Sequence, residues 1–445
     1  MEGDVRIPTA AGSIDDMAEI FLGVVADDFT GASDAASMLS EAGVPTVLFN
    51  GIPEKSPELR PDIRAVVVAE KTRTMPKAEA VSEMLKAFDW LKKIGAKQLY
   101  FKYCATFDST SEGNIGPVVD AVLDDYGIPS TVLVPALPVN GRTVKHGKLY
   151  VNGVPLEESH MRNHPLTPMT ESSVKKLIEM QSKYSACEIS IEDMEGGLKW
   201  EKYQKFKESV SGEKHYIIPD FYEDVHGDLI AEIFGDIPFL TGGSGLCGAL
   251  GRRYVKLHGA EIKGTELRKN QSNDKREGKT LLLAGSCSKI TLEQIDDYKT
   301  KKNPSIFMDP VMLMEDGISA AEVFTQAENM GDRVLVYSSQ KPEEMKKTQK
   351  LGLEKVASKI ETAMGTLANE AVKKGYTNII SAGGETSGAV TKALGYSAFY
   401  IGKSVAPGVP VMTPLDNEKL RIVLKSGGFG QTDFFERAIN LVSET

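Results

Sequence analysis

Cysteine is scarce in this sequence, and the four cysteines lie far apart. Cys104, Cys187, Cys247 and Cys287 form no C-x-x-C pair. We therefore expect reduced thiols rather than disulfides or a zinc site. Reduced thiols are typical of the cytosol, so we expect a cytoplasmic protein.

Long apolar runs and excess positive charge are also missing. No stretch approaches the roughly 18 apolar residues of a membrane-spanning helix, so we expect no membrane association. The net charge of −10 argues against a nucleic-acid partner, because such domains concentrate Lys and Arg. The first 19 residues have neither the basic region nor the apolar run of a signal peptide. We expect residues 1–19 to form an N-terminal extension.

Short apolar runs alternate with helical patterns along both halves of the chain. This rhythm predicts an α/β fold with mostly parallel sheets. In the first half the expected strands are Phe21–Val25, Thr46–Phe49, Ala65–Ala69, Gln98–Tyr103, Thr131–Pro135 and Tyr216–Pro219, with a hairpin over Pro138–Gly153. In the second half they are Thr280–Ala284, Ser305–Met308, Val334–Tyr337, Asn378–Ser381, Ser397–Ile401 and Leu420–Leu424.

A charged, polar segment separates the two alternating halves. Residues 263–279 offer few apolar contacts, which is typical of a linker. The expected division is an α/β domain over residues 20–262, a linker over 263–279 and a second α/β domain over 280–445. A cleft between two domains is a favoured place for a ligand, so we expect the active site there.

The first strand ends in a group of polar residues. Asp27 and Asp28 follow it directly, and Thr30 opens a helical pattern that stops at Gly43. In open α/β sheets ligands bind beyond the carboxyl ends of the strands, which favours a functional interpretation. The alternative is that Asp28 and Thr30 only satisfy the turn and the first free helix N–H groups.

A second polar group surrounds the strand Gln98–Tyr103. Lys102 lies within this apolar strand and needs an anionic partner, which Asp108 or a substrate carboxylate would supply. Ser109 follows Asp108, and Arg73 follows the strand Ala65–Ala69. Polar groups that recur after successive strands strengthen the prediction of a cleft at this sheet edge.

Three glycine-rich turns follow strands of the second half. They are GSCS at 285–288, AGGETSG at 382–388 and LKSGGFG at 424–430. Glycines let the backbone approach a ligand, and a following helix N-terminus favours an anion. We interpret the three turns as a nucleotide pocket, with the stiff loop Ala406–Pro410 as a wall. For the first turn the alternative is a self-capped helix with Thr291 and Gln294 as its capping box.

Two familiar nucleotide motifs are only partly matched. Residues 401–404 read IGKS, but the upstream glycine of a P-loop is replaced by Ser397. Gly243, Gly245 and Gly248 fit G-x-G-x-x-G, yet no βαβ unit with a terminal acid follows. An NAD-linked dehydrogenase therefore stays a minor alternative.

Seven motifs in this order resemble the four-carbon acid sugar kinase family over nearly the whole chain. They are VVADDFTGASDAA, KYCATFDSTSEGNIGP, PALPVNGRTV, HPLTPM, SAGGETSGAV, APGVP and LKSGGFG. The resemblance implies a sugar-acid-binding first domain, an ATP-binding second domain and transfer of a phosphoryl group to the C4 hydroxyl. Threonate and erythronate kinases of the family usually carry Leu-Arg where Ser111 and Glu112 stand here, which favours 3-oxo-tetronate as the substrate.

The resemblance also assigns residues to each ligand. ATP would contact Ser286 or Ser288, Gly383, Gly384, Glu385, Thr386, Gly427 and Gly428. The sugar acid would meet Asp27, Asp28, Arg73, Lys102, Asp108, Ser109, Asn140 and Arg142. We expect Asp28, with Asp27 second, to orient the hydroxyl or accept its proton, and Arg73 and Lys102 to anchor the substrate carboxylate.

Other expectations concern ions, assembly and rival functions. Mg²⁺ should bridge the phosphates, with no protein ligand named, and a homodimer is compatible with the sequence. The alternatives are a threonate or erythronate kinase and, from another class, a sugar-acid and nucleotide sensor without turnover.

Overall fold

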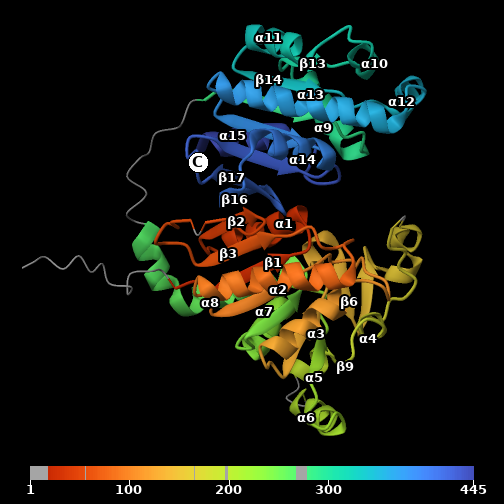
Figure 1. Ribbon diagram of the computed structural model, residues 1–445, viewed down its shortest axis with the longest axis vertical. Helices are drawn as coiled ribbons and strands as arrows, with labels where there is room; N and C mark the ends of the chain where they lie inside the picture. Colours follow the sequence, from red (N-terminus) through yellow and green to blue (C-terminus); the bar gives the residue numbers. More distant parts are fainter. Residues whose placement is uncertain (1–18, 56, 165, 196–198, 267–277, 445) are drawn as a thin grey trace, which may run out of the picture.

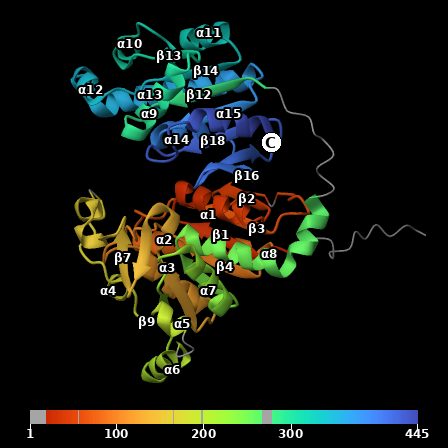
Figure 2. The same cartoon turned by 180° about the vertical axis from the view of Figure 1, so that it is seen from behind.

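One continuous sheet runs through both halves of the chain in the computed structural model (Figures 1 and 2). The structure describes residues 19–55, 57–164, 166–195, 199–266 and 278–444. Within them the strand order is β13-β14-β12-β15-β18-β17-β16-β2-β3-β1-β4-β11-β5-β10-β9. Helices cover both faces of this sheet, and the two α/β domains form the two lobes of the molecule.

The first half builds the sheet from β2 to β9. Its sheet strands are β1 (Leu22–Ala26), β2 (Thr46–Asn50), β3 (Ala65–Ala69), β4 (Gln98–Lys102), β5 (Ser130–Val134), β9 (Ser185–Ile189), β10 (His215–Pro219) and β11 (Phe239–Gly242). Its helices are α1 (Phe29–Glu41), α2 (Lys77–Lys93), α3 (Ile115–Asp125), α4 (Val174–Glu179), α5 (Ile191–Glu195), α6 (Lys199–Ser209), α7 (Asp224–Phe234) and α8 (Ser244–Glu266). All pairs among these strands are parallel.

The second half extends the sheet on the other side of β2, from β16 to the edge strand β13. Its strands are β12 (Thr280–Ala284), β13 (Ser305–Phe307), β14 (Arg333–Tyr337), β15 (Asn378–Ala382), β16 (Ala398–Ala406), β17 (Val409–Pro414) and β18 (Arg421–Lys425). Its helices are α9 (Lys289–Thr300), α10 (Pro310–Met314), α11 (Ala320–Met330), α12 (Pro342–Gln349), α13 (Leu353–Lys373), α14 (Gly384–Leu394) and α15 (Phe434–Glu444).

Composition explains why the central strands lie in the interior. Every residue of β1, β3, β12 and β15 is buried, as expected for parallel strands with helices on both faces. The Val-rich run of β3 (AVVVA) suits this position, because β-branched side chains favour the pleated backbone. These rigid strands fix the loops at their carboxyl ends.

The two halves of the sheet meet where β16 pairs antiparallel with β2. Since β17 is antiparallel to both β16 and β18, the parallel strands of the second half run opposite to those of the first. Five pairing steps separate β1 from β18, yet residues that follow β1, β3 and β4 line one cavity together with residues that follow β18. The domain boundary therefore gathers loops from both halves.

The hairpin β16–β17 differs from the expected short strand and stiff loop. β16 extends to Ala406, and Val409 already belongs to β17, so Pro407 and Gly408 form a tight turn. Gly408 has φ +76°, a conformation that favours glycine. The prediction thus stopped β16 at Ile401 and took the following residues as a loop; of the pairings of these two strands, only that of β16 with β2 joins residues far apart in sequence.

A small antiparallel sheet projects from the first lobe. It consists of β6 (Arg142–Lys145), β7 (Lys148–Val151) and β8 (Val154–Pro155), as the hairpin prediction for Pro138–Gly153 required. A bridge between Val144 and Phe221 ties it to the domain. This sheet holds Arg142 at the edge of the domain boundary.

The ends of the two halves fall partly outside the described residues. Residues 1–18 of the expected extension and 267–277 of the expected linker lie there. Helix α8 continues to Glu266, so the first residues assigned to the linker are helical. No helix among the described residues combines the length and apolarity that crossing a membrane would require.

Candidate active site

Arg73 joins three aspartates at the carboxyl ends of β1, β3 and β4. Its Nε and Nη2 donate to the two carboxylate oxygens of Asp27 at 2.9 and 2.8 Å. Nη2 also lies 3.1 Å from Asp28, and Nη1 lies 3.5 Å from Asp108. The sequence prediction that these four residues meet is therefore supported by the geometry, but the bidentate partner of Arg73 is Asp27.

Burial governs the electrostatics of this cluster. Asp27 is 5% exposed, and desolvation raises its pKa even though Arg73 acts in the opposite direction. Burial disfavours the charge of Arg73 as well, yet the hydrogen bonds that Arg73 donates to Asp27 raise its pKa overall. The guanidinium therefore holds the carboxylates in place as a permanent cation.

Asp28 has a structural task. It is the N-cap of α1, and its Oδ1 accepts a hydrogen bond from the Gly31 N–H at 2.7 Å. Its other oxygen faces Arg73. The capping alternative considered for Asp28 is thus present in the structure, beside whatever role the residue has toward a ligand.

Next to this cluster lies a cavity of about 460 Å³, which we call the acid cavity. The first lobe lines it with Asp28, Thr30, Gly31, Asp34, Arg73, Lys102, Cys104, Ala105, Thr106, Leu137, Asn140 and Arg142. The second lobe adds Pro407, Gly428, Phe429 and Gly430. Five of the predicted sugar-acid residues thus line one space between the domains.

The cations of the acid cavity differ in how freely they can meet a ligand. Lys102 ends β4, is 3% exposed and donates one hydrogen bond, to the Tyr103 carbonyl at 2.9 Å. Arg142 contacts the Asn140 carbonyl through one Nη atom. Since the fork of Arg73 is occupied by Asp27, Lys102 and Arg142 have more donors left for a substrate carboxylate.

Three predicted residues lie outside the cavity lining. Asp27 and Asp108 accept hydrogen bonds from Arg73 but do not line the cavity themselves. The Ser109 hydroxyl accepts a hydrogen bond from the Gln181 side chain at 3.0 Å. The HPLTPM loop reaches the same place, because the Thr167 hydroxyl donates to Asp108 and lies 2.8 Å from His164 Nδ1. These residues support the acid cavity from behind.

The three glycine-rich turns converge at the ends of the neighbouring strands β12, β15 and β18. The Ser288 hydroxyl donates to the Gly427 carbonyl at 2.6 Å. A Cβ on Gly427 would lie 2.6 Å from Ser286 Oγ, and one on Gly383 would lie 3.0 Å from the Ser286 backbone nitrogen. Glycine is required here by close approach of the turns.

The N-terminus of α9 is capped differently from the proposed Thr291–Gln294 box. The helix begins at Lys289, and its N-cap is Ser288, whose side chain accepts from the Thr291 N–H. Thr291 lies inside the helix and donates to the Gly427 carbonyl. The capping-box prediction is wrong because Thr291 is used to hold the neighbouring glycine turn.

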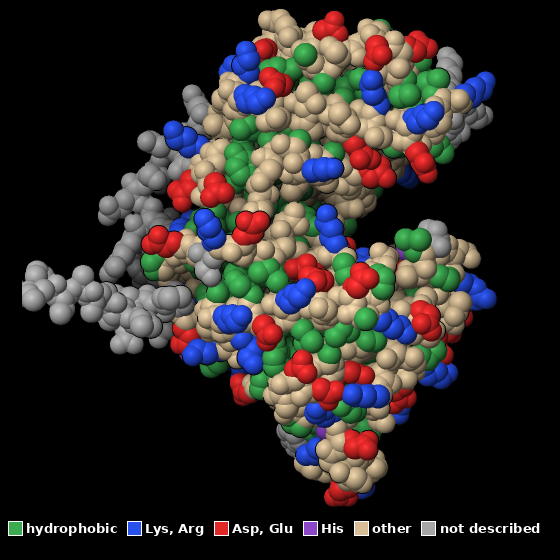
Figure 3. All heavy atoms as spheres, in the orientation of Figure 1, with side chains coloured by type: hydrophobic (Ala, Val, Ile, Leu, Met, Phe, Trp, Pro, Cys, Tyr) green, Lys and Arg blue, Asp and Glu red, His purple; other side chains and the backbone are tan. Residues whose placement is uncertain are grey.

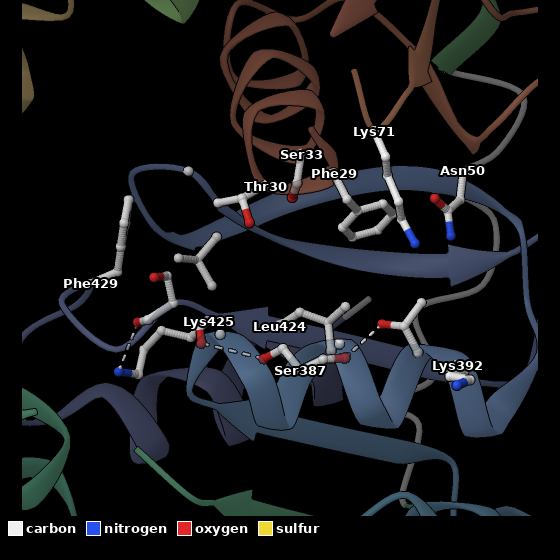
Figure 4. A pocket seen from close by; sticks show the side chains of 16 residues that line it. Phe29, Thr30, Ser33, Asn50, Lys71, Ser387, Lys392, Leu424, Lys425 and Phe429 are labelled. Atoms are coloured by element: carbon white, nitrogen blue, oxygen red, sulfur yellow. Dashed lines mark hydrogen bonds between the residues drawn. The ribbon is translucent and has the colours of Figure 1, made fainter. Parts of the chain in front are cut away.

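A second cavity of about 550 Å³ lies between α1 and α14, and we call it the lysine cavity (Figure 4). Lys71 and Asn50 extend toward it from the first lobe, with Ser387, Lys392 and Lys425 on the second. It shares Thr30 and Phe429 with the acid cavity. Figure 3 shows the notch between the two lobes from outside.

A third, apolar cavity of about 340 Å³ opens beside the same turns in the second lobe. Gly285, Cys287, Glu385 and Thr386 line its rim, and α12 and α13 supply apolar walls including Met345, Leu353, Val356, Ala357 and Ile360. Of the predicted ATP residues, Gly384 thus lines the lysine cavity, Gly428 the acid cavity, and Glu385 and Thr386 the apolar one.

Lys425 is the most informative residue that the sequence analysis missed. It ends the apolar strand β18 as Lys102 ends β4, so the argument made for Lys102 applied to it too. It is fully buried, and Nζ donates to Thr291 Oγ1 at 3.0 Å and to the Ser426 and Gly427 carbonyls. Burial lowers its pKa to about 8.

The lowered pKa of Lys425 predicts a pH-dependent stability. Between about pH 8 and the ordinary value of 10.5, the unfolded chain binds the proton that the folded chain has released. Stability contributed by this group therefore rises with pH across that window. We expect Lys425→Met to gain thermal stability relative to wild type at pH 7 and to lose this advantage by pH 10.

Differential scanning calorimetry at several pH values measures the effect. The exposed Lys289 provides the control, because Lys289→Met should shift the midpoint equally at every pH. If the unfolding temperatures of Lys425→Met and wild type differed by the same amount from pH 7 to 10, the account of Lys425 as a buried cation would be contradicted.

The partly matched nucleotide motifs have structural explanations. A Cβ on Gly243 or Gly245 would lie 2.6 or 2.8 Å from the Ala136 carbonyl oxygen. Both glycines therefore let the start of α8 pack closely against the segment that follows β5. Residues 401–404 lie within β16, whereas a P-loop connects a strand to a helix. Neither place offers a phosphate loop.

The expected Mg²⁺ has no site built by protein side chains in the described part of the chain. There, no group of three or more His, Cys, Asp or Glu side chains is arranged to hold a metal ion. Asp27 and Asp28 are engaged by Arg73 and by the N-terminus of α1. The described residues therefore form no cage of three or more side chains for a metal ion.

Comparisons with known proteins agree with the two-lobed geometry. Residues 22–250 match the model of a sugar-binding N-terminal domain, and residues 281–435 match a nucleotide-binding C-terminal domain. The 3-oxo-tetronate kinase of Brucella melitensis is 40% identical over 95% of this chain and 96% of its own. That of Actinobacillus succinogenes is 40% identical over 94% and 99%.

A solved structure shares the fold as well. The crystal structure of a Haemophilus influenzae protein, 38% identical over 94% of this chain and 99% of its own, superposes with a TM-score of 0.81. Fold and site thus define a two-domain protein that binds a sugar in one lobe and a nucleotide in the other. The chain belongs to the four-carbon acid sugar kinase family.

Proposed function

We propose that the protein transfers the γ-phosphoryl group of ATP to the C4 hydroxyl of 3-oxo-tetronate. The observation that carries the proposal is the pair of adjoining cavities between the lobes, one lined by acids and cations and the other by lysines, which share Thr30 and Phe429. The relatives named above, 3-oxo-tetronate kinases matched over nearly their whole length, support the same reaction.

The acid cavity suits a small hydroxylated anion. Lys102 and Arg142 offer free donors to the substrate carboxylate, and Asn140 offers an amide to its hydroxyl groups. Arg73 fixes the carboxylates that face this space. We assign binding of the sugar acid to these residues, with Asp27, Asp108 and Ser109 supporting them.

The converging glycine turns suit the phosphate chain. Their exposed backbone and the N-termini of α9 and α14 favour anions, and Lys71, Lys392 and Lys425 add positive charge nearby. We place the phosphates at Ser286, Gly383, Gly384 and Gly427, and the base in the apolar cavity beside Glu385 and Thr386. Gly428 would then lie where the γ-phosphoryl group faces the acid cavity.

Catalysis in this arrangement depends on positioning and charge compensation. Phosphoryl transfer requires the acceptor oxygen in line with the leaving oxygen, balanced negative charge and a carboxylate at the hydroxyl. A Mg²⁺ ion bound by the phosphates would supply further charge neutralisation. Closure of the lobes over both substrates would exclude water and limit hydrolysis of ATP.

The choice among four-carbon acids rests on the relatives. Ser111 and Glu112, which stand where related kinases have Leu-Arg, are exposed and do not line the acid cavity, and Glu112 pairs with Lys77 at 3.0 Å. The absence of an arginine at this position therefore removes no direct contact from the proposed substrate site. The names of the relatives reported above therefore support this part of the proposal.

A substrate panel tests the proposal. The protein is incubated with ATP and Mg²⁺ and with 3-oxo-tetronate, D-threonate or D-erythronate, while ADP release and the product mass are followed. We expect the highest kcat/KM with 3-oxo-tetronate and a 4-phosphate product. Preference for threonate or erythronate would contradict the substrate, and binding of ATP without ADP release in the presence of every acid would contradict the kinase and favour a sensor.

A further inference from the structure

The carboxylates beside the acid cavity differ in how many of their oxygens are free. Both oxygens of Asp27 accept from Arg73. Asp28 accepts from the Gly31 N–H with one oxygen and faces Arg73 with the other. A carboxylate that takes a proton from a substrate needs an oxygen within hydrogen-bond reach of that proton. The oxygens of Asp27 and Asp28 are already engaged by Arg73 and the Gly31 N–H.

Asp34 has one carboxylate oxygen that accepts no hydrogen bond from the described residues. It lies one helical turn after Thr30 on the same face of α1, and both residues line the acid cavity. Its Oδ2 accepts a hydrogen bond from the hydroxyl of the fully buried Ser244 at the start of α8. Its Oδ1 is buried and has no hydrogen-bond partner among the described residues.

The free oxygen lies at the boundary between the two cavities. A Cβ on Gly408 would stand 2.9 Å from Asp34 Oδ1, so this oxygen faces the β16–β17 turn of the second lobe. Gly408 lines the lysine cavity, whereas Asp34 and Pro407 line the acid cavity. A phosphoryl group that moves from one cavity to the other has to pass this boundary.

We propose that Asp34 is the general base of the phosphoryl transfer, acting through Oδ1 on the C4 hydroxyl of the sugar acid. The hydroxyl O–H bond breaks and its proton goes to Oδ1, while the acceptor oxygen forms a bond to the γ-phosphorus. The bond from that phosphorus to the bridging oxygen breaks, and its electron pair leaves with ADP. Ser244 holds the other carboxylate oxygen and so positions the base.

This inference rests on the proposed function and refines it, since the sequence analysis assigned the same role to Asp28, with Asp27 second. Around Asp34 stand Lys102 from β4, Asp28 at the N-cap, Glu41 on α1, and the buried Cys247 with Ser244 on α8. Burial raises the pKa of Asp34, with Lys102 and the Ser244 hydrogen bond acting in the opposite direction. A raised pKa makes the carboxylate a stronger base near neutral pH.

Asp34→Asn tests the assignment in the full-length enzyme with ATP and the best acid of the panel. We expect kcat to fall by about 10²–10⁴-fold, with KM for both substrates within about three-fold of wild type. The decline of kcat at acid pH should be lost, because the group that titrates is gone. Asp316→Asn, at an exposed position that lines none of the three cavities, is the matched control and should behave as wild type.

Ser244→Ala gives a readout that does not depend on the folding of Asp34→Asn. Because the Ser244 hydrogen bond lowers the pKa of Asp34, its removal should shift the acid limb of the kcat profile to higher pH. An unmoved limb in Ser244→Ala would overturn the proposal. So would near-normal kcat in Asp34→Asn, or loss of the limb in Asp28→Asn instead. A wild-type enzyme that phosphorylates none of the acids would contradict the proposed function itself.

Discussion

Replacing Arg73 by methionine is expected to cost more than any other single change in the acid cluster. The substitution leaves Asp27, Asp28 and Asp108 without their shared cation. Breaking a buried ion pair by removing one partner costs about 3–5 kcal/mol. We expect thermal stability to fall accordingly and kcat/KM for the sugar acid to drop by about 10²–10⁴-fold.

Two further variants separate geometry from charge. Arg73→Lys keeps the positive charge but loses the fork that binds Asp27 through two nitrogens, so we expect an intermediate loss. Arg252→Met removes an arginine whose side chain is 40% exposed and whose Nε donates to Asp228 at 2.8 Å, and should cost at most about 1 kcal/mol. If Arg73→Met and Arg252→Met lowered thermal stability and kcat/KM equally, the proposed role of Arg73 in holding the three aspartates would be contradicted.

Lys102→Met is expected to weaken binding of the sugar acid selectively. Lys102 is the buried cation of the acid cavity whose donors are least used by the protein. A hydrogen bond to a charged group is worth about 1.5–3 kcal/mol, which corresponds to an increase in KM of about 10–150-fold. KM for ATP should stay within about three-fold, because Lys102 lines the acid cavity and not the lysine cavity.

Steady-state kinetics with each substrate varied in turn measures this split. Lys97→Met serves as the control, because Lys97 precedes the same strand but is exposed and paired with Glu19 at 3.5 Å. If Lys102→Met raised KM for ATP as strongly as KM for the acid, the assignment of the two cavities would be wrong.

Local sequence patterns predicted the strands that carry this candidate site. The strands β1 and β3 are apolar runs of five residues followed by polar turns, and such runs identify buried parallel strands without any partner information. Because parallel strands end at a common edge, Asp28, Arg73 and Lys102 were expected together, and they line one cavity. The glycine turns of the second half converge for the same reason.

Other features depend on contacts that sequence spacing does not contain. The pairing of β16 with β2 joins residues about 350 positions apart, and it decides where the two lobes meet. The free oxygen of Asp34 follows from the way Ser244 and Gly408 approach it from distant elements. Lys425, by contrast, could have been found, because a lysine that ends an apolar strand is the signal that identified Lys102.

A crystal structure with ADP and a four-carbon acid tests the central claim most directly. We expect the nucleotide phosphates against Ser286, Gly383 and Gly427, and the carboxylate of the acid within hydrogen-bond distance of Lys102. The hydroxyl to be phosphorylated should then face the boundary that Thr30 and Phe429 share between the cavities. Nucleotide phosphates bound beside Arg73 in the acid cavity, or an acid bound away from it, would contradict the account.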